Sequence, residues 1–191
     1  MKILYFDTET TGTDYQRHEI TQFAAIIEID GEVKEEVNLR CQPKNWDAID
    51  PQAIQTTGIS IEELKTFMPP EEMLAQIKDL LGAYIPKYTK MPDKFYPAGH
   101  NVQFDLEFLN KLFKDHGNDE DRKWGITSYQ NWRALDSRVF GNFLTAAGKL
   151  PTDNMKLGSI CQHYGIEIDA HDALSDIRAT RAVIQKMMQN L

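Results

Sequence analysis

The first third of the chain alternates between apolar and polar positions with the two-residue period that is typical of β-strands. Residues 2–6 form a short run of mostly apolar side chains, which predicts a buried strand. Residues 19–29 and 33–41 predict two further strands, and Asp30-Gly31 between them is a typical hairpin turn. Residues 43–58 then predict a connection with short helical turns.

Apolar positions with helical spacing take over in the middle of the chain. One such stripe follows Pro69 and Pro70, and a second follows a predicted strand at residues 95–99. The two stripes consist of Met73, Ile77, Leu80, Leu81 and Tyr84, and of Phe104, Phe108, Leu109, Leu112 and Phe113. Each predicts a helix with one face in the core.

The last third continues this alternation. Residues 118–123 predict a polar loop, and residues 132–135 predict a short strand. The spacing at residues 157–164 predicts a helix that Gly165 ends, and residues 173–187 predict a final helix. Antiparallel strands followed by strand–helix alternation favour an α/β fold.

Length and charge narrow the class of protein. The 191 residues are 41% hydrophobic, which is enough for a sizeable core, and we expect one domain over residues 1–191. The formal net charge of −8 argues against coating long stretches of nucleic acid. It is compatible with an enzyme that grips a few nucleotides through metal ions.

The same sequence indicates a compartment. No segment is long and apolar enough to span a membrane, so we expect no membrane partner. The first residues lack the pattern of a secretory signal. Cys41 and Cys161 have no metal-ligand spacing, so we expect two reduced thiols in a cytoplasmic protein.

Two carboxylates directly follow the first predicted strand. Asp7 and Glu9 are two residues apart, and side chains with this spacing on a strand point to the same face. Two such anions repel each other, so one takes up a proton unless a cation lies between them. Carboxylate oxygens suit Mg²⁺ or Mn²⁺. A solvated turn is the alternative, but the apolar strand before the pair and Thr10-Thr11-Gly12 after it favour a metal site.

A second polar group follows the strand predicted at residues 95–99. His100 and Asn101 come first, and Asp105 then lies in the first turn of the predicted helix. His100 and Asn101 can be simple turn residues. Asp105 can simply stabilise the helix N-terminus, where the helix dipole favours a carboxylate.

A third polar group precedes the final helix. Asp172 has the side chain of a good N-cap, His171 comes just before it, and Asp176 lies about one turn inside the helix. A histidine near a buried carboxylate can be structural. A neutral imidazole beside a metal-bound water is also the natural general base near pH 7. The residues alone leave both roles open.

Taken in order, the three groups resemble the motifs of one family. Residues 7–12, residues 101–105, and His171 with Asp176 are similar to the three exonuclease motifs of the DEDD-type, DnaQ-like 3′–5′ exonucleases, in their histidine-containing subtype. This resemblance implies a ribonuclease H-like α/β fold, with a central mixed sheet flanked by helices.

Further segments are similar to the nuclease domain of the bacterial exonuclease I group. They are residues 22–25, 41–43 and 57–59. Many polymerase proofreading subunits have a histidine where this chain has Thr57, which weakens an assignment to those subunits. The chain ends soon after the third motif, so we expect it to lack the additional domains of exonuclease I and to be less processive.

The resemblance also implies a role for each acidic residue. Asp7 would bridge two divalent cations, Mg²⁺ or Mn²⁺, which lie about 3.5–4 Å apart and clamp the scissile phosphate between them. Glu9 and Asp176 would be ligands of the first ion, and Asp105 would serve the second. His171 would be the general base or would orient the attacking water.

A second set of residues is implied for the substrate. Thr10, Thr11 and Gly12 directly follow the metal pair and would line the pocket for the terminal nucleotide, where Gly12 allows close backbone approach. His100 and Asn101 join them as candidate substrate-binding residues.

We therefore expect a metal-dependent 3′–5′ exonuclease that releases nucleoside 5′-monophosphates from the 3′ end of single-stranded DNA. One alternative is an exoribonuclease of the same superfamily that acts on short RNA. Another is a proofreading or nuclease-like subunit that mainly binds a polymerase or another replication or repair protein. The intact set of acidic residues and histidine disfavours this last role.

Overall fold

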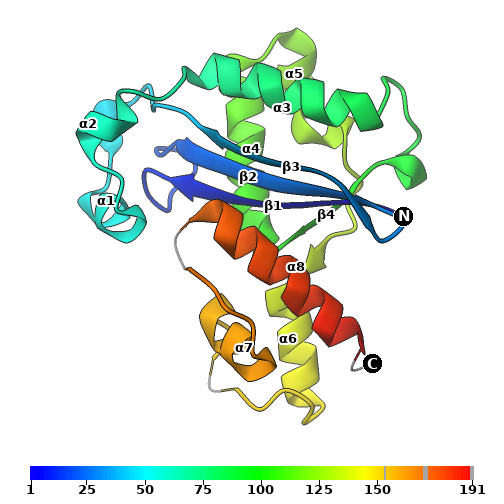
Figure 1. The fold of residues 1–191 in the computed structure, drawn as a ribbon. Helices are drawn as coiled ribbons and strands as arrows, with labels where there is room; N and C mark the ends of the chain where they lie inside the picture. Colours follow the sequence, from blue (N-terminus) through cyan, green and yellow to red (C-terminus); the bar gives the residue numbers. More distant parts are fainter. Residues whose placement is uncertain (153, 170–171, 190–191) are drawn as a thin grey trace.

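The computed structural model describes residues 1–152, 154–169 and 172–189. A five-stranded mixed sheet with the order β3-β2-β1-β4-β5 lies at the centre, and helices cover both of its faces (Figure 1). The strands are β1 (Lys2–Thr10), β2 (Ile20–Ile29), β3 (Glu32–Arg40), β4 (Tyr96–Gly99) and β5 (Leu135–Asp136). The predicted α/β architecture is confirmed.

The first three strands form an antiparallel meander. β2 and β3 are joined at Asp30 and Gly31, whose φ values of 53° and 86° are both positive. Two-residue hairpin turns of this kind need positive φ at both positions, because only then does the turn follow the twist of the strands. The predicted hairpin is confirmed. β4 and β5 instead run parallel to β1, which requires helical crossovers.

Helices provide these crossovers and cover the sheet. They are α1 (Pro51–Thr57), α2 (Ile61–Leu64), α3 (Pro70–Tyr84), α4 (Val102–His116), α5 (Asp119–Trp124), α6 (Ser137–Ala146), α7 (Leu157–Tyr164) and α8 (Ala173–Gln189). Short 3₁₀ turns lie at Trp46–Ala48, Met91–Asp93 and Gly125–Ser128. Both predicted apolar stripes pack into the core, one on α3 and one on α4.

β1 contributes side chains to the core on both faces of the sheet. On one face, Leu4 and Phe6 belong to the core cluster that also contains residues of α3 and α4. Ile3 and Tyr5 pack against α8 on the other. Both faces of β1 are therefore dry, which explains why its sequence is a nearly continuous apolar run.

Two predicted boundaries were wrong. The segment predicted as a polar loop contains α5, because Asn118 caps it by accepting the N–H groups of Glu120 and Asp121, each at 3.0 Å. The strand predicted at residues 132–135 shrinks to β5, and Trp132 is 77% exposed. Charged residues in a short capped helix read like a loop, and a two-residue strand has no period to detect. The helix α6 was not predicted from the sequence.

β1 is longer than the strand that was predicted at residues 2–6. β1 continues past Phe6 to Thr10, paired with β2 along its whole length. Its parallel partner β4 pairs only with residues 3–5 and then ends at Gly99. The last part of β1 is therefore open on the β4 side, and this is where the acidic residues lie.

Gly99 allows α4 to begin close to β1. A Cβ atom at this position would lie 3.0 Å from Val102 Cβ and Cγ2 and 3.2 Å from the carbonyl oxygen of Phe6. These approaches are tighter than ordinary van der Waals contact, so any larger residue would push the start of α4 away from the strand.

We expect Gly99→Ala to lower the free energy of unfolding by about 1–3 kcal/mol, because the new methyl group overpacks this junction. Gly82→Ala is the matched control. Gly82 is exposed on α3 with no atom within 4 Å of a new Cβ, so alanine should add up to about 1 kcal/mol through its higher helix propensity. Urea unfolding of both variants checks this, and equal stabilisation at the two positions would contradict the packing argument.

Candidate active site

Three carboxylates converge at the open end of β1. Asp7 and Glu9 share the face of β1 that also carries Ile3 and Tyr5, as their two-residue spacing predicts. α8 packs on this face, and its first turn carries Asp176. One carboxylate oxygen from each of Asp7, Glu9 and Asp176 lies within 4.8 Å of the others. The first and third sequence motifs therefore meet here.

Burial and mutual repulsion disturb these carboxylates strongly. Burial is the largest cause that raises the pKa of Asp7 well above its usual range, followed by the charges of Asp105, Asp176 and Glu9. Burial and the charges of Asp176 and Asp105 raise the pKa of Glu9 to about 8. Such a group takes up protons near neutral pH, or it binds cations.

Asp105 lies close to this group but is held separately. It is 3% exposed in the first turn of α4. Its Oδ1 accepts the backbone N–H of Thr8 at 2.9 Å and the Thr8 hydroxyl at 2.7 Å. Burial raises the pKa of Asp105 to about 7, even though the bonds from Thr8 act in the opposite direction. Thr8 thus fixes the direction of one oxygen of this buried carboxylate.

The start of α8 is anchored to the sheet through Asp172. Its Oδ2 accepts the N–H of Ser175 at 3.1 Å, which confirms the predicted N-cap. Its Oδ1 accepts from Gln22 Nε2 at 2.9 Å, and Arg40 lies 3.6 Å away. Burial alone would raise the pKa of Asp172, but these hydrogen bonds lower it. The neighbouring His171 lies outside the described residues, so its role stays a prediction.

A cavity of ≈ 320 Å³ opens beside Glu9. Its wall is formed by Thr8, Glu9, Thr10, Gly12, Thr13, Asp50, Gln52, Ala53, Thr56, Thr57 and Phe104. Of the predicted substrate-binding residues, Thr10 and Gly12 therefore reach this cavity. Thr11 instead is 1% exposed, and its hydroxyl accepts the N–H of Glu19 at 3.0 Å. The volume of the cavity is within the range of small-ligand sites.

His100 and Asn101 lie at the junction of β4 and α4 and do not line this cavity. His100 is partly buried, with its Nδ1 2.8 Å from Ser137 Oγ, and burial lowers its pKa. Asn101 is exposed, and its backbone is in the left-handed region with φ 65°.

The sequence did not reveal the contribution of α1 to the cavity wall. Gln52, Thr56 and Thr57 come from this helix. Its N-cap residue, Asp50, donates its N–H to the carbonyl oxygen of Thr11 at 2.8 Å, directly after the end of β1. Phe104 was predicted to be a core residue. It packs against the core and also lines the cavity, and its place directly before Asp105 was the available signal.

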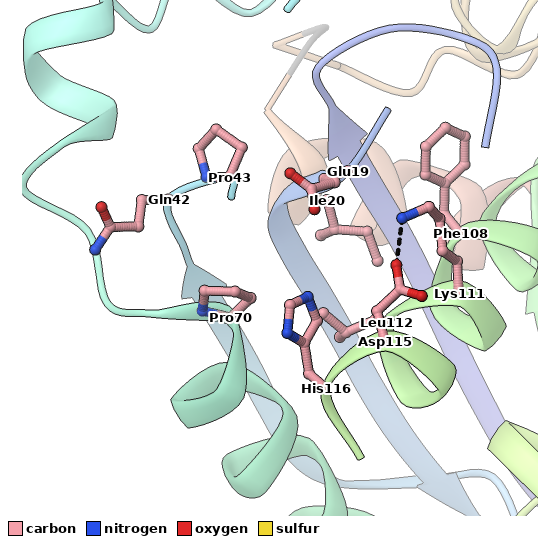
Figure 2. A pocket seen from close by; sticks show the side chains of 10 residues that line it. All are labelled: Glu19, Ile20, Gln42, Pro43, Pro70, Phe108, Lys111, Leu112, Asp115 and His116. Carbon is pink, nitrogen blue, oxygen red and sulfur yellow. Dashed lines mark hydrogen bonds and ion pairs between the residues drawn. The ribbon is translucent and has the colours of Figure 1, made fainter. Parts of the chain in front are cut away.

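A second group of possible metal ligands, Glu19, Asp115 and His116, lies elsewhere among the described residues (Figure 2). Here each side chain already has a partner. Glu19 Oε2 accepts the N–H of Lys44 at 2.8 Å, Asp115 pairs with Lys111, and His116 Nδ1 lies 3.3 Å from a carboxylate oxygen of α3. The hollow between them is only ≈ 10 Å³, about the space of one water. We interpret this group as a polar link between α3, α4 and the start of β2.

Curated proteins are similar to almost the whole chain. A PolC-type DNA polymerase III of Halalkalibacterium halodurans is 25% identical over 190 residues, covering 99% of this chain and 11% of that protein. Protein NEN2 of Arabidopsis thaliana is 24% identical, covering 96% of this chain and 34% of that protein. This chain therefore spans only a minor part of the length of these relatives.

Solved structures share the fold. An exonuclease I from Methylocaldum szegediense is 27% identical with a TM-score of 0.73, over 95% of this chain and 39% of that one. E. coli exonuclease I in complex with a dA16 oligonucleotide is 25% identical with a TM-score of 0.74, over 98% of this chain and 40% of that one. The predicted ribonuclease H-like fold is confirmed.

None of the helices in the described ranges combines the length and apolar character of a membrane-spanning helix.

The comparisons and the sequence motifs together give a family assignment. The family model of the RNase T type, described as Exonuclease, matches residues 4–184. This match, the shared fold and the order of the motifs show that the chain belongs to the exonuclease family, which is part of the DEDD-type superfamily of 3′–5′ exonuclease enzymes.

Proposed function

We propose that this chain is a 3′–5′ exonuclease that depends on divalent cations and releases nucleoside 5′-monophosphates from 3′ ends of single-stranded DNA. The observation that carries this proposal is the convergence of Asp7, Glu9 and Asp176 at the edge of an open cavity. Glu9 belongs both to the carboxylate group and to the cavity wall. A nucleotide in the cavity would therefore place its phosphodiester beside the carboxylates.

The residues of this site fit two Mg²⁺ or Mn²⁺ ions. Asp7, Glu9 and Asp176 would hold one ion together, and Asp105 would serve a second. Carboxylate oxygens are the hard ligands that these ions prefer. Burial is the largest cause of the raised pKa values of Asp7, Glu9 and Asp105, and neighbouring carboxylates raise those of Asp7 and Glu9 further. Bound cations would favour the charged form of each group. When bound, such ions polarise the phosphodiester and lower the pKa of the attacking water.

The chain's own residues would place the substrate. Thr10 and Gly12 would contact the terminal nucleotide from β1, and the Phe104 ring would stack on its base. Thr8 would hold Asp105 in a fixed direction through its two hydrogen bonds. His171 is proposed to accept the proton of the attacking water, because of its place in the third sequence motif.

Single-stranded DNA is the proposed substrate because solved structures of the similar E. coli exonuclease I include complexes with a dA16 oligonucleotide and with single-stranded DNA. The names of the PolC-type relatives favour a second candidate, a proofreading nuclease that works with a polymerase. Thr57, at the position where many proofreading subunits have a histidine, lines the cavity. We therefore favour the independent exonuclease, and tight binding to a replicative polymerase would favour the second candidate.

We also propose that the protein works in the cytoplasm. Cys41 and Cys161 are both buried free thiols. Burial raises the pKa of Cys41 to about 12 and that of Cys161 to about 11, so both stay protonated. Unpaired thiols of this kind are typical of a reducing compartment.

The polarity of digestion is the direct test of the proposed function. We expect a 5′-labelled single-stranded DNA to be shortened stepwise in Mg²⁺ and to stay intact in EDTA. A 3′-phosphate should block the reaction, because the terminal 3′ hydroxyl must enter the cavity, whereas a 5′ block should have no effect. An RNA of the same sequence should react more slowly. Cutting of circular DNA, or undiminished release from the 3′-phosphorylated strand, would contradict the proposal.

Asp7→Asn tests two expected consequences of the carboxylate group, namely metal-dependent activity and a lower stability of the metal-free protein. We expect it to lower activity by more than about 10²-fold, because a proposed metal ligand is lost. It should also raise the melting temperature of the metal-free protein at pH 8, because a buried amide cannot ionise and so adds no charge to the carboxylate group. Asp79→Asn, on the exposed face of α3, is the control and should change neither. Both properties are measured in parallel by oligonucleotide digestion and thermal unfolding in EDTA.

The pH dependence of the metal-free protein follows from the burial of these carboxylates together with their repulsion. The pKa values of Glu9 and Asp105, about 8 and about 7, lie above those of an unfolded chain. The folded state therefore binds more protons, and this contribution to stability is lost as pH rises through these values. Wild-type protein in EDTA should lose melting temperature from pH 6 to pH 8, and Asp7→Asn should lose less. An equal loss in the two proteins would count against a coupled carboxylate group.

His171→Ala tests the proton acceptor. If His171 accepts the proton of water, turnover should fall by roughly 10²–10⁴-fold. The Mg²⁺-induced rise in melting temperature should persist, because Asp7, Glu9, Asp105 and Asp176 remain. The acidic limb of the pH–rate profile should also weaken. Full turnover, or a loss of metal binding as severe as in Asp7→Asn, would exclude this role.

A further inference from the structure

A single carboxylate joins the N-termini of two helices at the edge of the sheet. Asp136 ends β5 and caps α6, where its Oδ1 accepts the N–H groups of Arg138 at 2.8 Å and Val139 at 3.3 Å. The same carboxylate accepts from the start of α4, with Asn101 N 3.1 Å from Oδ1 and Val102 N 3.0 Å from Oδ2. An ordinary N-cap serves one helix, whereas this one serves two.

α4 depends on this borrowed cap. Its own N-cap residue, Asn101, makes no side-chain capping bond and has a left-handed backbone. The pairing of β4 with β5 sets Gly99 opposite Asp136, which brings the carboxylate next to the start of α4. His100 is held from the same side, through its contact with Ser137. The whole turn that leads into α4 is therefore fixed from β5 and the first residue of α6.

The first turn of α4 carries Asp105. Val102 begins the helix, and Asp105 follows within the same turn. From the other side, β1 holds the Asp105 carboxylate through Thr8. A movement of this turn would shift the Asp105 oxygens relative to Asp7, the residue whose pKa the Asp105 charge helps to raise.

We propose that Asp136 is a positioning residue of the active site, which sets the place of Asp105 by holding the first turn of α4 to β5. The inference rests on the proposed function, in which Asp105 serves a cation. The alternative is that Asp136 only caps α6. Serine separates these roles, because it is a good N-cap for its own helix but its short hydroxyl does not span both helices.

The test compares Asp136→Ser with wild-type protein. The first readout is the Mn²⁺ concentration that gives half of the maximal rise in melting temperature, which needs no activity. The second is kcat and KM on 5′-labelled single-stranded DNA. We expect a roughly 10- to 100-fold higher Mn²⁺ midpoint and a loss of kcat of similar size, with little change in KM. In EDTA the melting temperature should stay within a few degrees of wild type.

Two further variants make the result decisive. Asp136→Ala removes both caps, so it should melt lower than Asp136→Ser but share its Mn²⁺ midpoint. Asn118→Ala removes the cap of α5, beyond the far end of α4, so it should melt lower with the midpoint and kcat of wild type.

Wild-type Mn²⁺ midpoint and kcat in Asp136→Ser would overturn the inference, as would a lower melting temperature with an unchanged midpoint. These outcomes are distinct from a failure of the proposed function. If the wild-type protein digests no nucleic acid, that function is wrong, and the Mn²⁺ midpoints still report whether Asp136 positions Asp105.

Discussion

Repulsion among four acidic side chains at the end of β1 is the constraint on which the rest of the structure depends. Asp7 and Glu9 lie on one strand, while Asp105 and Asp176 arrive from two helices. Both of these helical carboxylates lie in a first turn, where the unpaired N–H groups and the helix dipole favour negative charge. The fold thus offsets part of the repulsion by directing two helix N-termini at the same point. Cations would have to offset what remains.

A few long-range polar contacts keep the charges in place against this repulsion. Thr8 binds Asp105 across 97 residues of sequence, and Gln22 binds Asp172 across 150. The first contact joins β1 to α4, and the second joins β2 to the start of α8. Each contact requires a strand and a helix from distant parts of the chain to lie side by side. The site is therefore a product of the tertiary structure, although the residues within each motif lie close together in sequence.

Sequence reasoning succeeded where a local period or turn has a direct physical meaning. The β2–β3 hairpin was predictable because Asp30 and Gly31 tolerate positive φ, and the convergence of Asp7 with Glu9 followed from the two-residue period of a strand. It failed for α5, whose charged residues carry no apolar stripe, and for β5, which is too short to have a period. Sequence rules of this kind detect periodic patterns. A cap defines α5 and pairing with β4 defines β5, and neither produces such a pattern.

The remaining parts of the site were hidden because their roles arise only in three dimensions. Thr11 belongs to the first motif, yet its hydroxyl is used to hold the segment before β2, while Thr57 reaches the cavity from a helix some fifty residues along the chain. Asp136 directly follows the strand predicted at residues 132–135, and its contact with the start of α4 forms only because β5 pairs with β4. Two kinds of group hold the repelling carboxylates in place. Thr8 binds Asp105 through its hydroxyl and its backbone N–H. Asp136 and Asp172 instead hold the starts of α4 and α8 to the sheet with carboxylates of their own. Each of these contacts joins elements that are distant in sequence or paired only in the sheet, so the spacing of the acidic residues alone does not reveal them.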